Sequence, residues 1–121
     1  MKNYYITNDE LKKEIIKSLE ENEITKELHI LFYKLATNIS MKNTFKDKTK
    51  HFPYLIDDMI NEGYIKCTKK YKNFDFEYNN PFSFFTTIIS NAFLDCIYKE
   101  NKYTNIQDEN KEKIISIIYS K

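Results

Sequence analysis

A chain of 121 residues is long enough for one compact domain and too short for two ordinary ones. Its apolar fraction of 41%, with ten Tyr and nine Phe, is ample for a core and excludes a disordered protein. The net charge of +1 excludes a strongly basic protein, so the chain alone is expected to bind duplex DNA weakly. One Gly and two Pro leave little room for tight hairpins, which favours helices joined by polar loops.

Two helices are expected in the first third of the chain. Thr7 and Glu10 have the spacing of a capping box, and apolar residues then recur at helical intervals. After a polar break, a second helix is expected from about Thr25 to residues 38–40. The lysine-rich stretch 42–51 is weakly patterned, which indicates a loop or a short frayed turn.

A third helix is expected to begin at Pro53, a favourable first-turn residue, and to continue to about Tyr71. Ile65 and Cys67 are expected to continue its buried side. Gly63 lies in the middle of this pattern, where glycine costs about 1 kcal/mol relative to alanine. Close approach of another helix or of a partner is a natural reason to carry it.

The C-terminal part is expected to contain one long helix and one short helix. After a loop over 72–80, Asn80 is a plausible N-cap and Pro81 a first-turn residue for a helix that runs to about Lys102. A shorter helix is expected over 108–119. The sequence therefore predicts an all-α, compact bundle of four to five helices.

Catalytic and metal chemistry find little support in this sequence. His29 and His51 stand far apart without a ligand pattern, and a single Gly cannot build a phosphate-binding loop. We expect no enzyme, no metal and no cofactor. Cys67 and Cys96 are expected to be reduced core thiols. No stretch reaches the length of a membrane span, so a membrane role is not expected.

The segment over 73–93 is dense in aromatic residues. Three phenylalanines open the expected fourth helix, and helical geometry cannot bury all of them on one stripe. Rings stack on unpaired bases at about 1–3 kcal/mol each, and lysines neutralise phosphates, so such a segment suits single-stranded DNA. The candidate DNA-binding residues are Phe82, Phe84, Phe85, Thr86, Thr87, Asn91, Lys69, Lys70, Lys72, Lys99 and Lys102.

An ordered set of short motifs resembles region 2 of sigma-70-type factors, most closely the late sigma factors of T-even-like bacteriophages. The motifs are MINEGYI over 59–65, NFD over 73–75, NPF over 80–82, TTII over 86–89 and NAF over 91–93. The resemblance covers about residues 4–102. It implies one region 2-like domain over 1–121, with N-terminal helices and a linker over 4–52, polymerase-binding and promoter-reading helices over 53–102, and a C-terminal helix over 103–121.

The resemblance implies a sigma factor that directs RNA polymerase to late viral promoters, in the cytoplasm of an infected bacterial host. It would recognise and melt an AT-rich −10-like element. One face would dock on the clamp helices of the largest polymerase subunit. The matching residues are Asp58, Asn61, Glu62, Tyr64, Ile65 and Thr68.

The other implied face contacts the non-template strand of promoter DNA. Phe85 falls at the position of the ring that stacks on a flipped base, so Phe85→Ala is expected to keep polymerase binding and to reduce open-complex formation strongly. A coactivator or a sliding clamp is a further implied partner. The segment 117–119 could contact such a clamp, although packing on the bundle is favoured.

Departures from the family keep two alternatives open. Ile88 and Ile89 stand where sigma-70 proteins carry paired Trp, and Asp95 enters a stretch that is more basic in the phage factors. The first alternative is a helical polymerase-binding regulatory protein that does not read DNA, in which the three phenylalanines should all be substantially buried. The second is a generic single-stranded nucleic-acid binder, which would not need the polymerase face.

Overall fold

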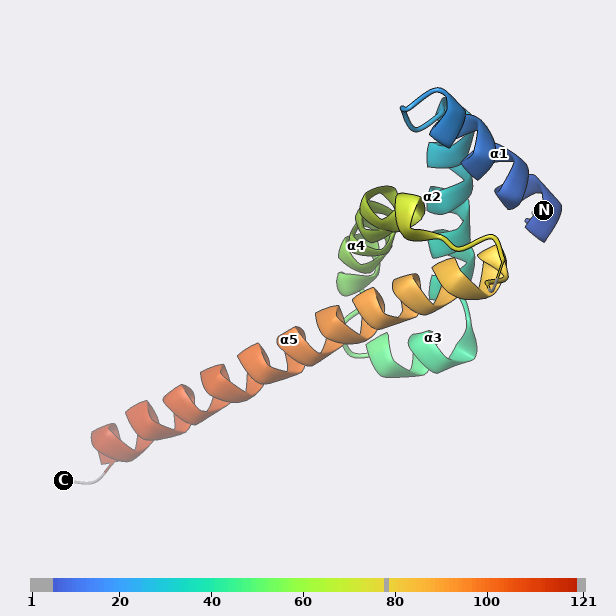
Figure 1. The fold of residues 1–121 in the computed structure, drawn as a ribbon. Coiled ribbons are helices and arrows are strands. Elements are labelled where there is room, and N and C mark those ends of the chain that lie inside the picture. The colour runs from blue at the N-terminus through green and yellow to red at the C-terminus, as the bar shows by residue number, and fades with distance from the viewer. Residues whose placement is uncertain (1–5, 78, 120–121) are drawn as a thin grey trace.

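The computed structural model describes the backbone of residues 6–77 and 79–119 and the side chains of residues 6–77 and 79–102. The described residues form helices and connecting loops, with no strand among them. The elements are α1 (Asn8–Glu20), α2 (Lys26–Ser40), α3 (Asn43–Thr49), α4 (Leu55–Lys70), the 3-10 turn η1 (Tyr71–Asn73) and α5 (Pro81–Tyr119). The predicted all-α bundle of four to five helices is therefore confirmed (Figure 1).

Threonine caps fix the starts of the first two helices. The Thr7 hydroxyl accepts the Glu10 N–H at 3.1 Å, and the Thr25 hydroxyl accepts the Leu28 N–H at 3.1 Å. The buried Ser18 hydroxyl of α1 also accepts the Thr25 N–H at 3.0 Å, which ties α1 to the start of α2. Both predicted starts are confirmed because each side chain satisfies a backbone donor that the first helical turn leaves open.

The expectation of a loop over 42–51 is wrong, because α3 occupies most of this stretch. Phe45 and Thr49 are buried one helical turn apart, and the Phe45 ring packs edge-on against Phe93 with centroids 5.1 Å apart. The Thr49 hydroxyl also donates to the Phe45 carbonyl at 2.7 Å. A two-turn helix is not stable alone, so packing against α5 supplies what the local pattern lacks.

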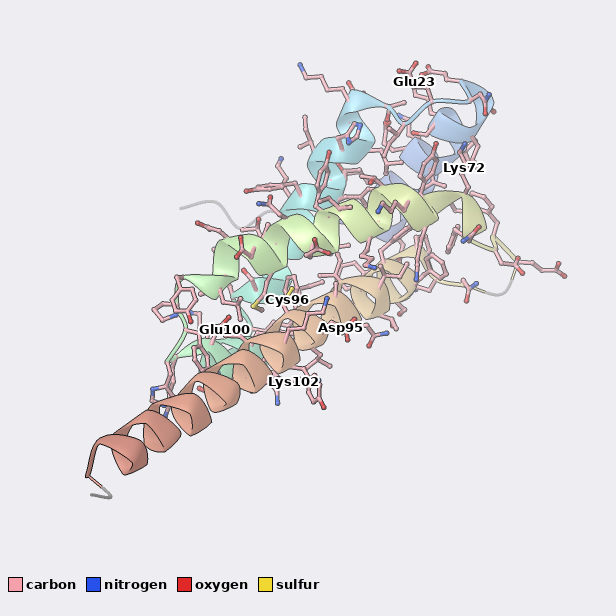
Figure 2. All side chains as sticks on the ribbon, turned by 90° about the vertical axis from the view of Figure 1, so that its left-hand side faces the viewer. Glu23, Lys72, Asp95, Cys96, Glu100 and Lys102 are labelled. Atoms are coloured by element: carbon pink, nitrogen blue, oxygen red, sulfur yellow. The ribbon has the colours of Figure 1, made fainter. Side chains whose placement is uncertain are left out.

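Helices α4 and α5 run alongside each other in opposite directions and form the largest interface of the bundle (Figures 1 and 2). Gly63 is buried at this crossing. A Cβ atom there would lie 3.0 Å from Cε1 of Phe93 and 3.1 Å from Cγ2 of Ile89. The expected close approach is therefore made by α5, and Gly63 is not available to a partner. Ile65 was expected on the buried side, but it is 37% exposed.

A single helix, α5, replaces the two helices expected after the loop, because no break occurs between Pro81 and Tyr119. Its 39 residues span about 58 Å, and its C-terminal half extends well beyond the other helices (Figure 1). The side chains of the candidate clamp-contact segment 117–119 lie outside the described residues. Within the described part of the chain, none of the helices combines the length and apolar character needed to cross a membrane.

Candidate nucleic-acid and polymerase interfaces

Phe85 is completely buried, so the prediction that its ring stacks on a base is wrong. Its ring centroid lies 4.8 Å from that of Phe32 on α2 and 6.0 Å from that of Phe74 in the loop before α5. Ile89 and Phe93, which follow at helical spacing, are buried with it. The ring belongs to the centre of the core and cannot reach a nucleic acid.

Phe82 and Thr86 lie on another side of α5. Successive residues rotate by about 100° around a helix, so Phe82 and Phe84 project in widely different directions. Phe82 is 37% exposed, and its backbone N–H donates to the Asn8 side-chain oxygen of α1 at 2.9 Å. Thr86 follows one turn later, and its hydroxyl oxygen is buried without a hydrogen-bond partner among the described residues. These two residues do not share a surface with Phe84.

Phe84 borders a hollow. It is half-buried, and its ring packs edge-on against Phe74 with centroids 5.4 Å apart. The hollow beside it has a volume of about 320 Å³. We call it the Phe84 hollow, and its lining residues are Asn79, Asn80, Ser83, Phe84, Thr87 and Ile88.

The Phe84 hollow combines a ring with amide and hydroxyl groups. The Asn80 side-chain oxygen accepts the Ser83 N–H at 3.0 Å, which confirms the predicted N-cap of α5. The Thr87 hydroxyl donates to the Ser83 carbonyl at 2.9 Å, so its oxygen can still accept a hydrogen bond. The Asn80 amide nitrogen can still donate. Because the N–H groups of Phe82 and Ser83 are already bonded to side chains, the first turn of α5 offers little to a phosphate.

The predicted lysines fall into two groups. Lys69 and Lys70 end α4 and Lys72 lies in η1, at the end of the α4–α5 pair that also carries the Phe84 hollow. Lys99 and Lys102 are also exposed but lie several turns further along α5, and Figure 2 shows Lys72 and Lys102 well separated. Asn91 is exposed, two turns after Phe84 on the same side of α5.

Acidic residues gather near the second lysine group. Cys96 lies between α4 and α5 (Figure 2), where burial raises the pKa of its thiol and the carboxylate of Glu62 raises it further. Lys99 lowers the pKa of this thiol, whereas Asp58 and Asp95 raise it. The carboxylates of Asp58, Glu62 and Asp95 therefore all lie near Cys96, at the interface between α4 and α5. Their negative charge makes the nearby Lys99 a poor candidate for a phosphate contact.

The predicted polymerase-binding residues share one face of α4. All six are exposed or half-buried, and they follow one another at spacings that place them on the side of α4 turned away from Gly63. Tyr64 marks the edge towards α2, where its hydroxyl is hydrogen-bonded to Nδ1 of His29 at 2.6 Å. Glu62 marks the edge towards α5 and Cys96. The face is defined by Asp58, Asn61, Glu62, Tyr64, Ile65 and Thr68.

The sequence did not single out a second hollow, which lies between α2 and α4 and has a volume of about 390 Å³. Ile30 and Tyr33, which fall outside the apolar stripe of α2, are 42% and 48% exposed beside it. The position of these two apolar residues outside the apolar stripe is the sequence signal that could have indicated this hollow. We call this site the α2–α4 groove, and its lining residues are His29, Ile30, Tyr33, Lys34 and Tyr64.

Comparisons of the chain with protein-family models, with curated proteins and with solved structures gave no match. Among the described residues, no cluster of His, Cys, Asp and Glu side chains could hold a metal ion.

Proposed function

We propose that this chain is a sigma-type initiation factor that binds RNA polymerase through α4 and holds an unpaired promoter base beside Phe84. The observation that carries the proposal is the Phe84 hollow, in which a half-buried ring stands next to amide and hydroxyl groups. A base that leaves a duplex loses its stacking partners and its pairing partner. The ring can replace the first, and the polar groups can replace part of the second.

The magnitudes are compatible with melting that needs no ATP. Flipping a base out of a duplex costs a few kcal/mol and costs least in easily melted A/T steps. Stacking on one aromatic side chain returns about 1–3 kcal/mol. Hydrogen bonds to Asn79, Asn80 or Thr87 would add to this, and Lys69, Lys70 and Lys72 could contact phosphates at the same end of the helix pair.

Rigid packing of α4 on α5 would couple the two interfaces. The polymerase face belongs to α4, the Phe84 hollow belongs to the start of α5, and the tight contact at Gly63 leaves little freedom between these helices. A polymerase that grips α4 would thereby position the hollow over the DNA. We further propose that its targets are late viral promoters and that it acts in the cytoplasm of an infected bacterium.

The experiment compares Phe84→Ala with Phe82→Ala in complexes with core RNA polymerase on an AT-rich promoter. Unpaired thymines are detected by permanganate, and polymerase binding is measured by pull-down of the purified components. Phe84→Ala should keep polymerase binding and lower thymine reactivity by about tenfold, because one stacking contact is lost. Phe84→Tyr should restore the reactivity. Phe82→Ala, which removes a ring from another side of α5, should behave as the wild type.

Normal promoter opening by Phe84→Ala would contradict the assignment of the hollow. A wild-type chain that binds core polymerase but supports no run-off transcription would instead favour the second candidate, a polymerase-binding regulator that does not read DNA. Two observations favour this second candidate: Phe85 is completely buried, and the carboxylates near Cys96 would repel phosphates.

A further inference from the structure

Five exposed residues lead away from the Phe84 hollow along the outer side of α5. The first of them also lines the hollow, and each of the others follows the one before it by three or four residues. This spacing keeps them on one side of the helix, outside the buried side that Ile89 and Phe93 mark. We call these residues the α5 stripe, and they are Thr87, Asn91, Leu94, Tyr98 and Lys102.

The Tyr98 ring contributes little to the core. It keeps 71% of its surface in water, more than any other large apolar or aromatic side chain that the structure describes. Among residues 6–77 and 79–102, its hydroxyl has no hydrogen-bond partner and its ring has no neighbouring ring. One exposed tyrosine is ordinary on a protein surface, so exposure alone assigns it no function. What matters is where this free ring lies relative to Phe84.

Phe84 and Tyr98 lie on the same side of α5, about four turns apart. The step from residue 84 to residue 98 corresponds to about 21 Å along the helix axis. A stacked DNA strand rises by about 3.4 Å per nucleotide, so this distance spans about six stacked nucleotides, or about three in a strand stretched to twice that rise. The Thr87 hydroxyl and the Asn91 amide lie between the two rings. Rings joined by such polar groups suit one single strand of DNA.

The charge around the α5 stripe is small. Lys102 ends the stripe, and the exposed Asp95 borders it. The other carboxylates near Cys96 come from α4, and Cys96 lies between α4 and α5 (Figure 2). Two residues rotate a helix by about 200°, so Tyr98 faces away from this acidic interface. Because stacking requires little charge, it is the interaction that the stripe offers best to a nucleic acid.

We propose that the α5 stripe carries the single strand onward from the Phe84 hollow, with a second unpaired base stacked on Tyr98. Thr87 and Asn91 hydrogen-bond to the nucleotides in between, and Lys102 contacts a phosphate. The second base lies about three to six nucleotides from the one beside Phe84. Two stacked bases at this separation hold several base pairs apart, which one flipped base does not. The inference rests on the proposed function, because the strand starts at the Phe84 hollow.

The test uses the full chain with core RNA polymerase on promoter DNA that carries a preformed bubble. 5-Iododeoxyuridine is placed at one position of the non-template strand at a time, and light crosslinks it to a stacked ring. Mass spectrometry then identifies the crosslinked residue. We expect one position to crosslink to Phe84 and a second, about three to six nucleotides away, to crosslink to Tyr98. Because the bubble is already open, neither crosslink depends on a melting step.

Tyr98→Ala measures the contribution of the second ring. It should raise the dissociation constant of the complex for bubble DNA by about tenfold, because one stacking contact is lost, and should leave the Phe84 crosslink in place. Tyr98→Phe, which keeps the ring, should bind as the wild type does. Tyr54→Ala is the matched control, because Tyr54 is 63% exposed and its hydroxyl donates to Glu100 on another side of α5. This control should leave the dissociation constant unchanged.

Two results would overturn the inference alone. They are a crosslink to Phe84 with none to Tyr98 at any position, and a Tyr98→Ala variant that binds bubble DNA as tightly as the wild type. Loss of polymerase binding by Tyr98→Ala in a pull-down would also overturn it, because the α5 stripe would then face polymerase rather than DNA. No crosslink to either ring, with polymerase bound, would contradict the proposed function and the inference with it. Circular dichroism establishes that each variant is folded.

Discussion

Helix α4 and the first turns of α5 carry the two predicted interfaces. The predicted residues are all accessible on α4, but not on α5. On α4, all six predicted residues occupy one accessible face. On α5, the three phenylalanines are divided among three environments: Phe85 in the core, Phe82 beside α1 and Phe84 at a hollow. The two neighbouring helices thus differ in how well their sequences predict which residues are exposed.

This difference in predictability follows from how the apolar residues are distributed around each helix and from which helices pack against them. Helix α4 has polar residues over a wide arc, which leaves a narrow buried stripe, although Ile65 was wrongly expected to belong to it. The first turns of α5 carry Phe82, Phe84 and Phe85 on different sides of the helix, and α5 is contacted by α1, α2 and α4. Helical spacing places Phe85 on the same buried stripe as Ile89 and Phe93, whereas the resemblance assigned it to the DNA face. Its contact with Phe32 shows that the helical spacing was the better guide.

The largest expected effect is that of Phe85→Ala, which tests whether this ring belongs to the core. Removing a completely buried phenylalanine should lower the free energy of unfolding by about 3–5 kcal/mol. Urea unfolding followed by circular dichroism measures this change. Phe82→Ala, at 37% exposure, serves as the control and should cost much less. A similar small cost for both variants would show that the two rings are not in different environments.

Gly63→Ala tests how closely α4 and α5 approach each other. The new methyl group would lie 3.0 Å from Phe93 and 3.1 Å from Ile89, both of which are fully buried. Overpacking costs about 1–3 kcal/mol, and the gain in helix propensity returns about 1 kcal/mol. We therefore expect a net loss of about 1–2 kcal/mol in urea unfolding. A stabilised variant would mean that α4 and α5 approach less closely.

Cys67 offers a pH-dependent test of the same interface. Burial raises the pKa of its thiol from 9.0 to about 12. Above pH 9 the unfolded chain releases this proton while the folded chain keeps it, so stability is complete below pH 9 and is lost as the pH rises towards 12. The free energy of unfolding should fall by about 1 kcal/mol per pH unit in this window. Cys67→Ala should remove this component, and identical pH profiles of the two proteins would contradict the burial of the thiol.

Glu62→Lys should have the smallest effect on the fold and tests the α4 face. The side chain is exposed, so the free energy of unfolding should change by less than about 0.5 kcal/mol. Binding to core polymerase in a pull-down should nevertheless be lost if the α4 face is the docking surface. Lys66→Glu, which reverses an exposed charge outside the predicted set, is the control for charge reversal on this helix. Unchanged polymerase binding by Glu62→Lys would show that the α4 face is not the polymerase-binding surface that the proposed function requires.

Local signals were sufficient for the starts of α1, α2 and α5. Thr7, Thr25 and Asn80 are read correctly because a cap acts on backbone groups two or three residues away. Helix α3 could not be predicted because its stability depends on Phe45 meeting Phe93, a contact between residues far apart in sequence. The Phe84 hollow was not predicted. The sequence singled out the aromatic segment 73–93, and the resemblance then selected Phe85, a ring that Phe32 and Phe74 contact in the core.

The hydrogen bond from the Phe82 N–H to the Asn8 side chain joins residues 74 positions apart. During synthesis on a ribosome, α1 and α2 emerge well before the residues that cover them. Phe32 has no Phe85 to pack against until most of the polypeptide has been made. Helices α1 and α2 therefore keep apolar surface uncovered until α5 has been made, and the core is complete only when α5 packs against them.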